Sequence, residues 1–136
     1  ETDVATGNAD AGTLAYVTNT KVRGKLKTTL KSTTAGSAYL WEGGNDPGTI
    51  NGYRAFASNQ IPSNLTQGTS TTICSSIIFG NWAEAMVGLW GDAVDLIVDP
   101  YSSKNQNMIE VTAVVMCDIG VRHAASFSKS DAVLTT

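Results

Sequence analysis

The chain has 136 residues, a length that suits one domain with a single core. Hydrophobic residues make up 42% and charged residues 15%, and nine Lys and Arg against twelve Asp and Glu leave a net charge of −3. This composition excludes a generally disordered chain, a long solvated helix or coiled coil, and a protein whose main task is to grip nucleic acid. We expect no membrane span, because no apolar run approaches the roughly 20 residues that a span needs. We expect no secretory signal, because no basic region followed by an apolar one opens the chain.

The first third of the chain predicts a buried strand followed by a helix. Residues 14–17 are apolar, and Thr18 or Asn19 can cap a helix that runs to about Leu30. Its apolar stripe recurs every four residues, and Lys21, Arg23 and Lys25 lie away from it. We interpret this basic side as a solvated face, with a site for an anionic partner as the alternative.

The middle of the chain predicts short strands separated by turns and one polar loop. We expect strands at 39–41, 50–60, 73–79 and 92–98, with a turn-rich segment at 42–48 and an exposed loop at 62–72. Residues 82–90 favour helix by composition and strand by their flanks, so their conformation stays open.

The clearest periodicity comes near the end of the sequence. Every second residue from Ile109 to Val121 is apolar, which predicts a strand of about 13 residues, or roughly 43 Å. Ordinary strands have about 5 to 6 residues, so this length indicates a ribbon that spans an extended subunit.

No residue pattern in the chain is typical of an enzyme, a metal centre or a cofactor site. His123 is the sole histidine, which excludes a site with two His ligands, and the motifs of hydrolases, phosphate-binding loops and zinc proteases are absent. The acidic group of Asp92, Asp95, Asp99 and Asp118 lacks the spacing of a calcium-binding loop, so we interpret it as solvated turn residues.

The cysteines and the large aromatic residues are the remaining candidates for a functional role. Cys74 and Cys117 are interpreted as reduced, buried thiols, with a single disulfide as the alternative. The aromatic residues Trp41, Trp82, Trp90 and Tyr101 are candidate subunit-interface residues, because large aromatics among apolar neighbours more often pack than bind ligands.

Several segments together resemble the major capsid proteins of tailed bacteriophages, over about residues 8 to 128. Each segment is short, but their order and spacing are similar to those of that family. They are Asn8–Asn19, Val22–Lys27, Asn51–Ala55, Ser58–Pro62, Ser76–Trp82, Leu96–Tyr101 and Val121–Phe127.

The resemblance implies an α+β subunit with an axial domain, built on a sheet with flanking helices, and a peripheral domain. It divides the chain into a leading segment at 1–12, an axial domain at 13–103, the long strand of the peripheral domain at 104–128 and a C-terminal tail at 129–136. The family's N-terminal arm, extended loop and spine helix have no counterpart here. We therefore expect a C-terminal portion of a capsid protein, in keeping with a first residue other than Met.

Some members of that family join neighbouring subunits by a Lys–Asn isopeptide bond that a nearby Glu promotes. Asn107 falls at the matching Asn position, but Val114 stands where that Glu would be. We therefore expect Asn107 to be inactive in crosslinking.

The resulting hypothesis is a non-enzymatic structural subunit of a phage or prophage icosahedral capsid. It would self-assemble into hexamers and pentamers around packaged double-stranded DNA, with scaffold and portal proteins as further candidate partners and no membrane, cofactor or specific nucleic-acid ligand. It would lie in the virion after assembly in the bacterial cytoplasm. The alternatives are a β-rich binding or adhesion module that uses exposed Trp residues and, more remotely, a hydrolase built on the Asp92, Asp95 and Asp99 cluster with His123.

Overall fold

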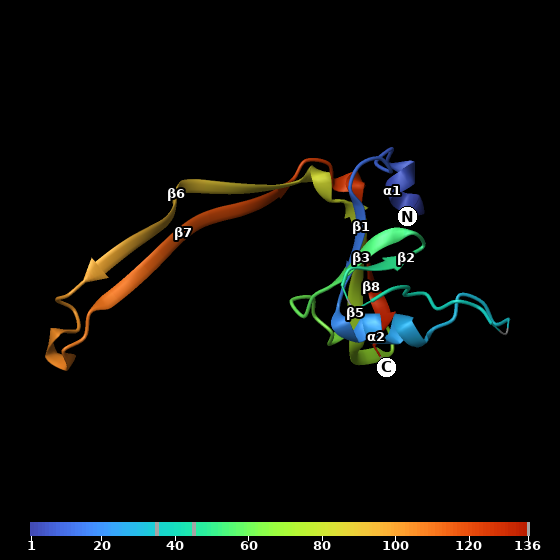
Figure 1. Ribbon diagram of the computed structural model, residues 1–136, viewed down its shortest axis with the longest axis horizontal. Helices are drawn as coiled ribbons and strands as arrows, with labels where there is room; N and C mark the ends of the chain where they lie inside the picture. The colour runs from blue at the N-terminus through green and yellow to red at the C-terminus, as the bar shows by residue number, and fades with distance from the viewer. Residues whose placement is uncertain (35, 45, 136) are drawn as a thin grey trace. The chain divides into compact units, whose positions relative to one another are not determined.

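The chain divides into two compact units, each with its own sheet. The computed structural model describes residues 1–34, 36–44 and 46–135, and for residues 92 and 93 the backbone alone. The sheet unit comprises Glu1–Glu84 and His123–Thr136, and the ribbon unit comprises Ala85–Arg122 (Figure 1). This division differs from the boundary expected at 103/104, because residues 85–99 pair with the long strand that follows them.

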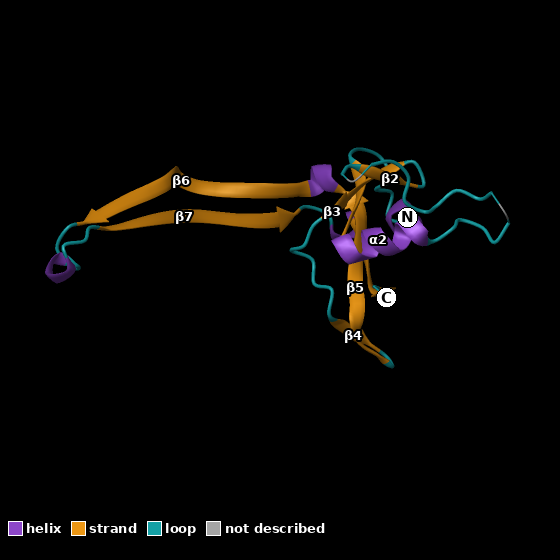
Figure 2. Cartoon of the chain, turned by 60° about the horizontal axis from the view of Figure 1, so that its bottom comes forward, coloured by secondary structure: helices purple, strands orange, loops and turns teal. Residues whose placement is uncertain are grey.

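The sheet unit contains a six-stranded sheet in which β1 lies at the centre. The strand order is β2-β3-β1-β5-β4, and β8 also pairs with β5. β1 and β3 are parallel, whereas the other pairs are antiparallel. Figure 2 shows the strands of the chain in orange. The elements are α1 (Thr2–Thr6), β1 (Leu14–Thr18), α2 (Thr20–Thr28), β2 (Gly48–Ile50), β3 (Tyr53–Ala57), β4 (Leu65–Gln67), β5 (Ser70–Asn81), η1 (Trp82–Glu84), η3 (Ala124–Ser126) and β8 (Phe127–Leu134).

The predicted strand and helix near the N-terminus are confirmed as β1 and α2. The Asn19 side chain accepts a hydrogen bond from the Lys21 amide at 2.9 Å, as an N-cap should. The same side chain donates to the Ile61 carbonyl at 2.5 Å, which ties the start of the helix to the loop after β3. The helix ends at Thr28, two residues before the predicted end at Leu30.

The core of the sheet unit lies on one face of the sheet. The rings of Tyr16 and Phe79 are 4.5 Å apart, and Tyr53 lies 5.2 Å from Phe79 in an edge-to-face arrangement. Ala55, with no exposed surface, packs in the same cluster. Burial raises the pKa of the Tyr16 hydroxyl, which donates to the Glu1 carboxylate and thereby links the start of the chain to β1.

The ribbon unit is a two-stranded antiparallel hairpin. Its strands are β6 (Ala85–Asp99) and β7 (Glu110–Val121), joined through the short helix η2 (Lys104–Gln106). The register runs from Ala85 opposite Val121 to Asp99 opposite Glu110, with an irregularity in β6 between Trp90 and Asp95. The predicted long strand is therefore confirmed as β7, and its partner is the segment directly before it.

Local predictions need correction in several segments, and one open segment is now assigned. Residues 39–41 form one isolated bridge between Tyr39 and Leu30 in place of a strand. The predicted tail at 129–136 is largely β8, whose residues pair with β5. The loop at 62–72 contains β4, and the open segment at 82–90 is a single short helical turn followed by β6.

Candidate interface surface

The two faces of the ribbon differ sharply in chemistry. Successive side chains of a strand point to opposite faces, and cross-strand partners share a face. The register therefore places one set of residues together on what we call the apolar face, which consists of Ala85, Val87, Leu89, Leu96, Val98, Val111, Ala113, Val115, Cys117, Ile119 and Val121.

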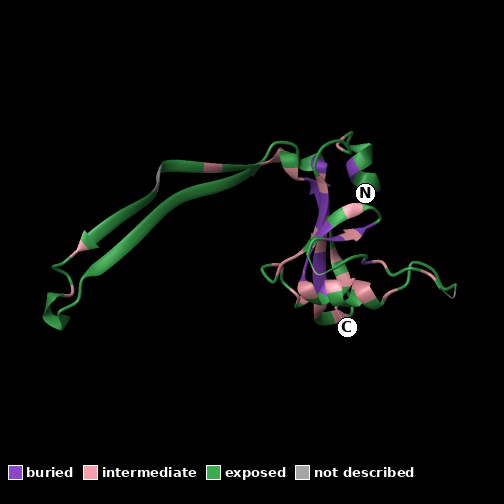
Figure 3. Cartoon of the chain, viewed as in Figure 1, coloured by how far each residue is buried: buried purple, intermediate pink, exposed green. Residues whose placement is uncertain are grey.

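The apolar face carries no charge and is open to solvent. Ile119 is 69% exposed, Leu96 67% and Val111 59%, and Figure 3 shows the strands of the ribbon almost wholly in the colour for exposed residues. An isolated two-stranded hairpin is marginally stable in water, and a large exposed apolar patch marks an interaction surface. The face therefore has the properties of a surface that a partner covers.

The opposite face, which we call the mixed face, carries every acidic strand residue of the ribbon whose side chain is described. Asp95, Asp99, Glu110 and Asp118 alternate there with apolar and small residues. Asp99 and Glu110 lie directly opposite one another, a like-charge pair that weakens a hairpin. β6 and β7 contain no Lys or Arg, so neither strand neutralises this charge.

Asp99 has a local structural role at the tip of the ribbon. The Ser102 hydroxyl donates to its carboxylate at 2.5 Å, and the Tyr101 amide donates at 2.8 Å. These hydrogen bonds lower the pKa of Asp99, so it remains ionised while it holds the turn.

The four aromatic residues predicted for an interface fall into two groups. Trp41 is 3% exposed and donates its indole N–H to the Gly44 carbonyl, so it is a core residue and the interface expectation is corrected. Trp82 is half-buried against Phe127, with ring centroids 5.3 Å apart. Trp90 and Tyr101 are 59% and 77% exposed on the ribbon, where an interface role stays a prediction.

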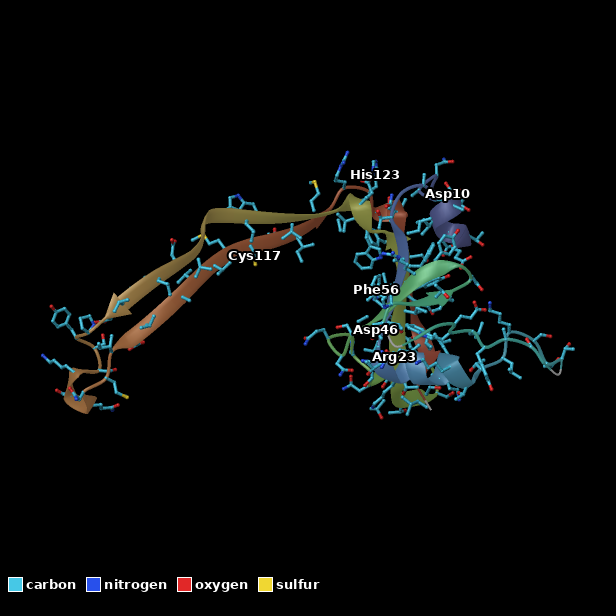
Figure 4. All side chains as sticks on the ribbon, viewed as in Figure 1. Asp10, Arg23, Asp46, Phe56, Cys117 and His123 are labelled. Atoms are coloured by element: carbon cyan, nitrogen blue, oxygen red, sulfur yellow. The ribbon has the colours of Figure 1, made fainter. Side chains whose placement is uncertain are left out.

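The cysteines differ from one another in exposure. Both are free thiols, but only Cys74 is buried as expected. Cys117 is exposed on the apolar face (Figure 4), so the expectation of a buried thiol is wrong for this residue.

The remaining candidate residues belong to different units of the chain. His123 Nδ1 lies 3.5 Å from Glu84 in the sheet unit, whereas Asp95 and Asp99 belong to the ribbon unit. Among the described residues, no three His, Cys, Asp or Glu side chains gather as a metal site would require. The side chain of Asp92 lies outside the described residues.

Asn107 has a left-handed backbone (φ 55°, ψ 37°) at the end of η2, and so lies in the tip turn just before β7. Within the described part of the chain, no helix is both long and apolar enough to cross a membrane.

The sequence indicates only one of the two strands that form the apolar face. The alternation in β7 is clear from the sequence, whereas Gly91 and the irregular stretch after Trp90 interrupt the period of β6, so the sequence does not identify β6 as the partner of β7. The pairing across that irregularity completes the apolar face.

Comparisons with known proteins identify the family. The model of the phage capsid family matches residues 3–131. The chain is 30% identical over 128 residues to a major capsid protein of Halomonas phage phiHAP-1, a match that covers 94% of the chain and 18% of that relative. The chain thus spans less than a fifth of the length of this curated relative.

A solved structure shares the fold. The capsid of an empty GTA particle computed with C5 symmetry superposes with a TM-score of 0.63 at 19% identity, over 93% of this chain and 40% of that chain. The fold agrees with the resemblance of the sequence segments, and the family match extends over nearly the whole chain. The chain therefore belongs to the phage capsid family.

Proposed function

We propose that this chain is part of a non-enzymatic structural subunit that self-assembles into the capsomers of an icosahedral phage or prophage shell around double-stranded DNA. The apolar face of the ribbon is the observation that carries the proposal. A subunit of a closed shell must offer surfaces that identical or neighbouring segments cover, and this face offers a row of apolar side chains without a charge.

The two units fit the two domains that the family resemblance implies. We assign the sheet unit to the axial domain and the ribbon unit to part of the peripheral domain, with the division at 84/85 and 122/123. This assignment explains why a two-stranded ribbon lacks a core of its own, since a peripheral domain would complete it with further segments or subunits.

The net charge of the chain suits a shell that encloses DNA without binding it tightly. A net charge of −3 gives no general attraction to phosphates, which basic surfaces bind. The proposed subunit would contact other copies of itself, and scaffold and portal proteins during assembly in the bacterial cytoplasm, and would end in the virion.

The alternative of an adhesion module loses support from the placement of its tryptophans. Trp41 is buried and Trp82 packs against Phe127, which leaves Trp90 alone on the surface. A sugar-binding platform built on one exposed indole lacks the second ring or polar cluster that would orient a glycan.

Electron microscopy of the natural protein that contains this chain tests the proposal. We expect capsomer rings or closed shells in negative stain after expression in bacteria. Discrete monomers across a range of salt and protein concentrations would contradict self-assembly. A circular dichroism spectrum of folded protein from the same sample would exclude misfolding as the cause.

A further inference from the structure

A pocket of about 360 Å³ opens on the mixed face of the ribbon. Met86, Val87, Gly88 and Trp90 of β6 line it together with Asp118 and Gly120 of β7. All six residues belong to the ribbon unit, so the pocket is complete within one hairpin.

Two glycines shape this pocket. A side chain at Gly88 would meet the Trp90 ring at 2.8 Å, which shows that the indole lies over this glycine. A side chain at Gly120 would meet no atom within 4 Å, so the space above Gly120 is open. The result is an opening bordered by the aromatic ring and by the side chain of Asp118, which is two residues from Gly120 on the same face.

An indole beside a carboxylate selects for a cation. The ring attracts an ammonium or guanidinium group through its quadrupole, and the carboxylate adds an ionic contact. The Ile119 amide donates to Asp118 Oδ1 at 2.8 Å, which restrains the orientation of the carboxylate. β6 and β7 contain no basic residue, and Arg122, just beyond β7, does not line the pocket.

The chain carries a matching donor in its basic segment. Residues 11–41 contain five Lys and Arg and no Asp or Glu. Arg23 and Lys31 form ion pairs with Asp46 and Glu42, whereas Lys21 is exposed and its ammonium has no partner among the described residues. Lys21 lies in the first turn of α2, so a rigid element presents it.

We propose that the pocket of Trp90, Asp118 and Gly120 accepts the Lys21 side chain of a second copy of this chain. The contact is heterologous, with the pocket of one copy facing α2 of the next, which is the kind of contact that builds rings of identical subunits. The inference rests on the proposed function, since shell assembly is what brings many copies side by side.

Charge exchange between copies tests the contact. Asp118→Lys removes the acceptor and Lys21→Asp removes the donor, so we expect each variant to self-associate about tenfold more weakly in sedimentation equilibrium at low salt. A one-to-one mixture of the two variants should regain association, because each copy then meets a partner of opposite charge. Asp95→Lys, on the same face but outside the pocket, is the matched control and should self-associate as the wild type does.

A second variant separates pocket filling from charge. Gly120→Val fills the open space and suits a strand, so it should fold and still associate about tenfold more weakly. Unfolding curves of all variants would show that the hairpin is retained. Trp90→Leu removes the indole face and should weaken association as Gly120→Val does.

Three outcomes would overturn the inference. These are a wild-type chain that stays monomeric up to millimolar concentration, variants that associate as wild type does, and a mixture that shows no rescue. Saturable binding of a neutral glycan that Trp90→Leu abolishes would also count against a lysine as occupant. Shells of the wild-type natural protein in electron microscopy would leave the proposed function intact in each of these cases.

Discussion

A single aspartate on the apolar face should disrupt assembly while leaving the isolated chain folded. Val111→Asp places a carboxylate on that face, opposite Val98 and near the tip of the ribbon, where Val111 is 59% exposed. Thr112→Asp introduces the same residue one position along β7 and therefore on the mixed face. The two variants have the same net charge and differ in the face that receives it.

The size of the effect follows from the exposed fraction of the valine. Full burial of an aliphatic side chain stabilises by about 1.5–3 kcal/mol, so covering the exposed 59% of Val111 contributes about 1–2 kcal/mol per subunit contact. Each 1.4 kcal/mol is a factor of ten in the association constant, and burial of the new charge adds to the loss. Val111→Asp should therefore weaken assembly at least tenfold.

The assay is light scattering of the natural protein during assembly, with urea unfolding of each variant as the control. We expect surface substitutions to change the free energy of unfolding by no more than about 0.5 kcal/mol in the isolated chain. Equal assembly by Val111→Asp and Thr112→Asp would refute the reasoning, since it would show that the faces do not differ in function.

Three further predictions concern stability and covalent chemistry. Phe79 is 5% exposed, so Phe79→Ala should lower the free energy of unfolding in urea by about 3–5 kcal/mol, because apolar burial is lost and a cavity forms. A decrease below about 1 kcal/mol would show that Phe79 is not a core residue. The Lys129 ammonium and the Ser76 hydroxyl donate to Asp131 and lower the pKa of that carboxyl. Ionised Asp131 should therefore stabilise the folded chain above about pH 4, and this stabilisation should be lost as the pH falls below that value. Unfolding midpoints that fall in parallel with pH for wild type and Asp131→Asn would contradict this prediction. Intact-mass measurement of assembled particles should give monomers, because the crosslink position Asn107 has no promoting Glu, and covalent multimers would show the opposite.

The sequence allowed good prediction of elements whose local signals agree with their surroundings. β1 and α2 combine an apolar run, a capping Asn19 and a stripe repeating every four residues, and the structure confirms both. β7 was predictable because its alternation is unbroken over its whole length. In each case the hydrophobic period of a single segment is sufficient to predict its secondary structure.

Features that depend on pairing or packing at a distance were not predictable in this way. β8 has a mixed pattern and becomes a strand through its hydrogen bonds with β5. Trp41 is buried because Gly48 leaves room for its indole, a side chain there being placed 2.2 Å from Nε1. The apolar face itself requires the register of β6 against β7 across an irregularity, which no single segment contains.

Thiol labelling gives the most direct test of whether the apolar face is covered in the assembled shell. Cys117 is an exposed free thiol on that face, and Cys74, with 1% exposure, is a built-in control inside the sheet unit. We predict that a maleimide modifies Cys117 rapidly in the isolated chain and that neither cysteine reacts in intact particles of the natural protein. Equally rapid modification of Cys117 in intact particles would show that the apolar face stays open to solvent, and would contradict its role as an assembly surface.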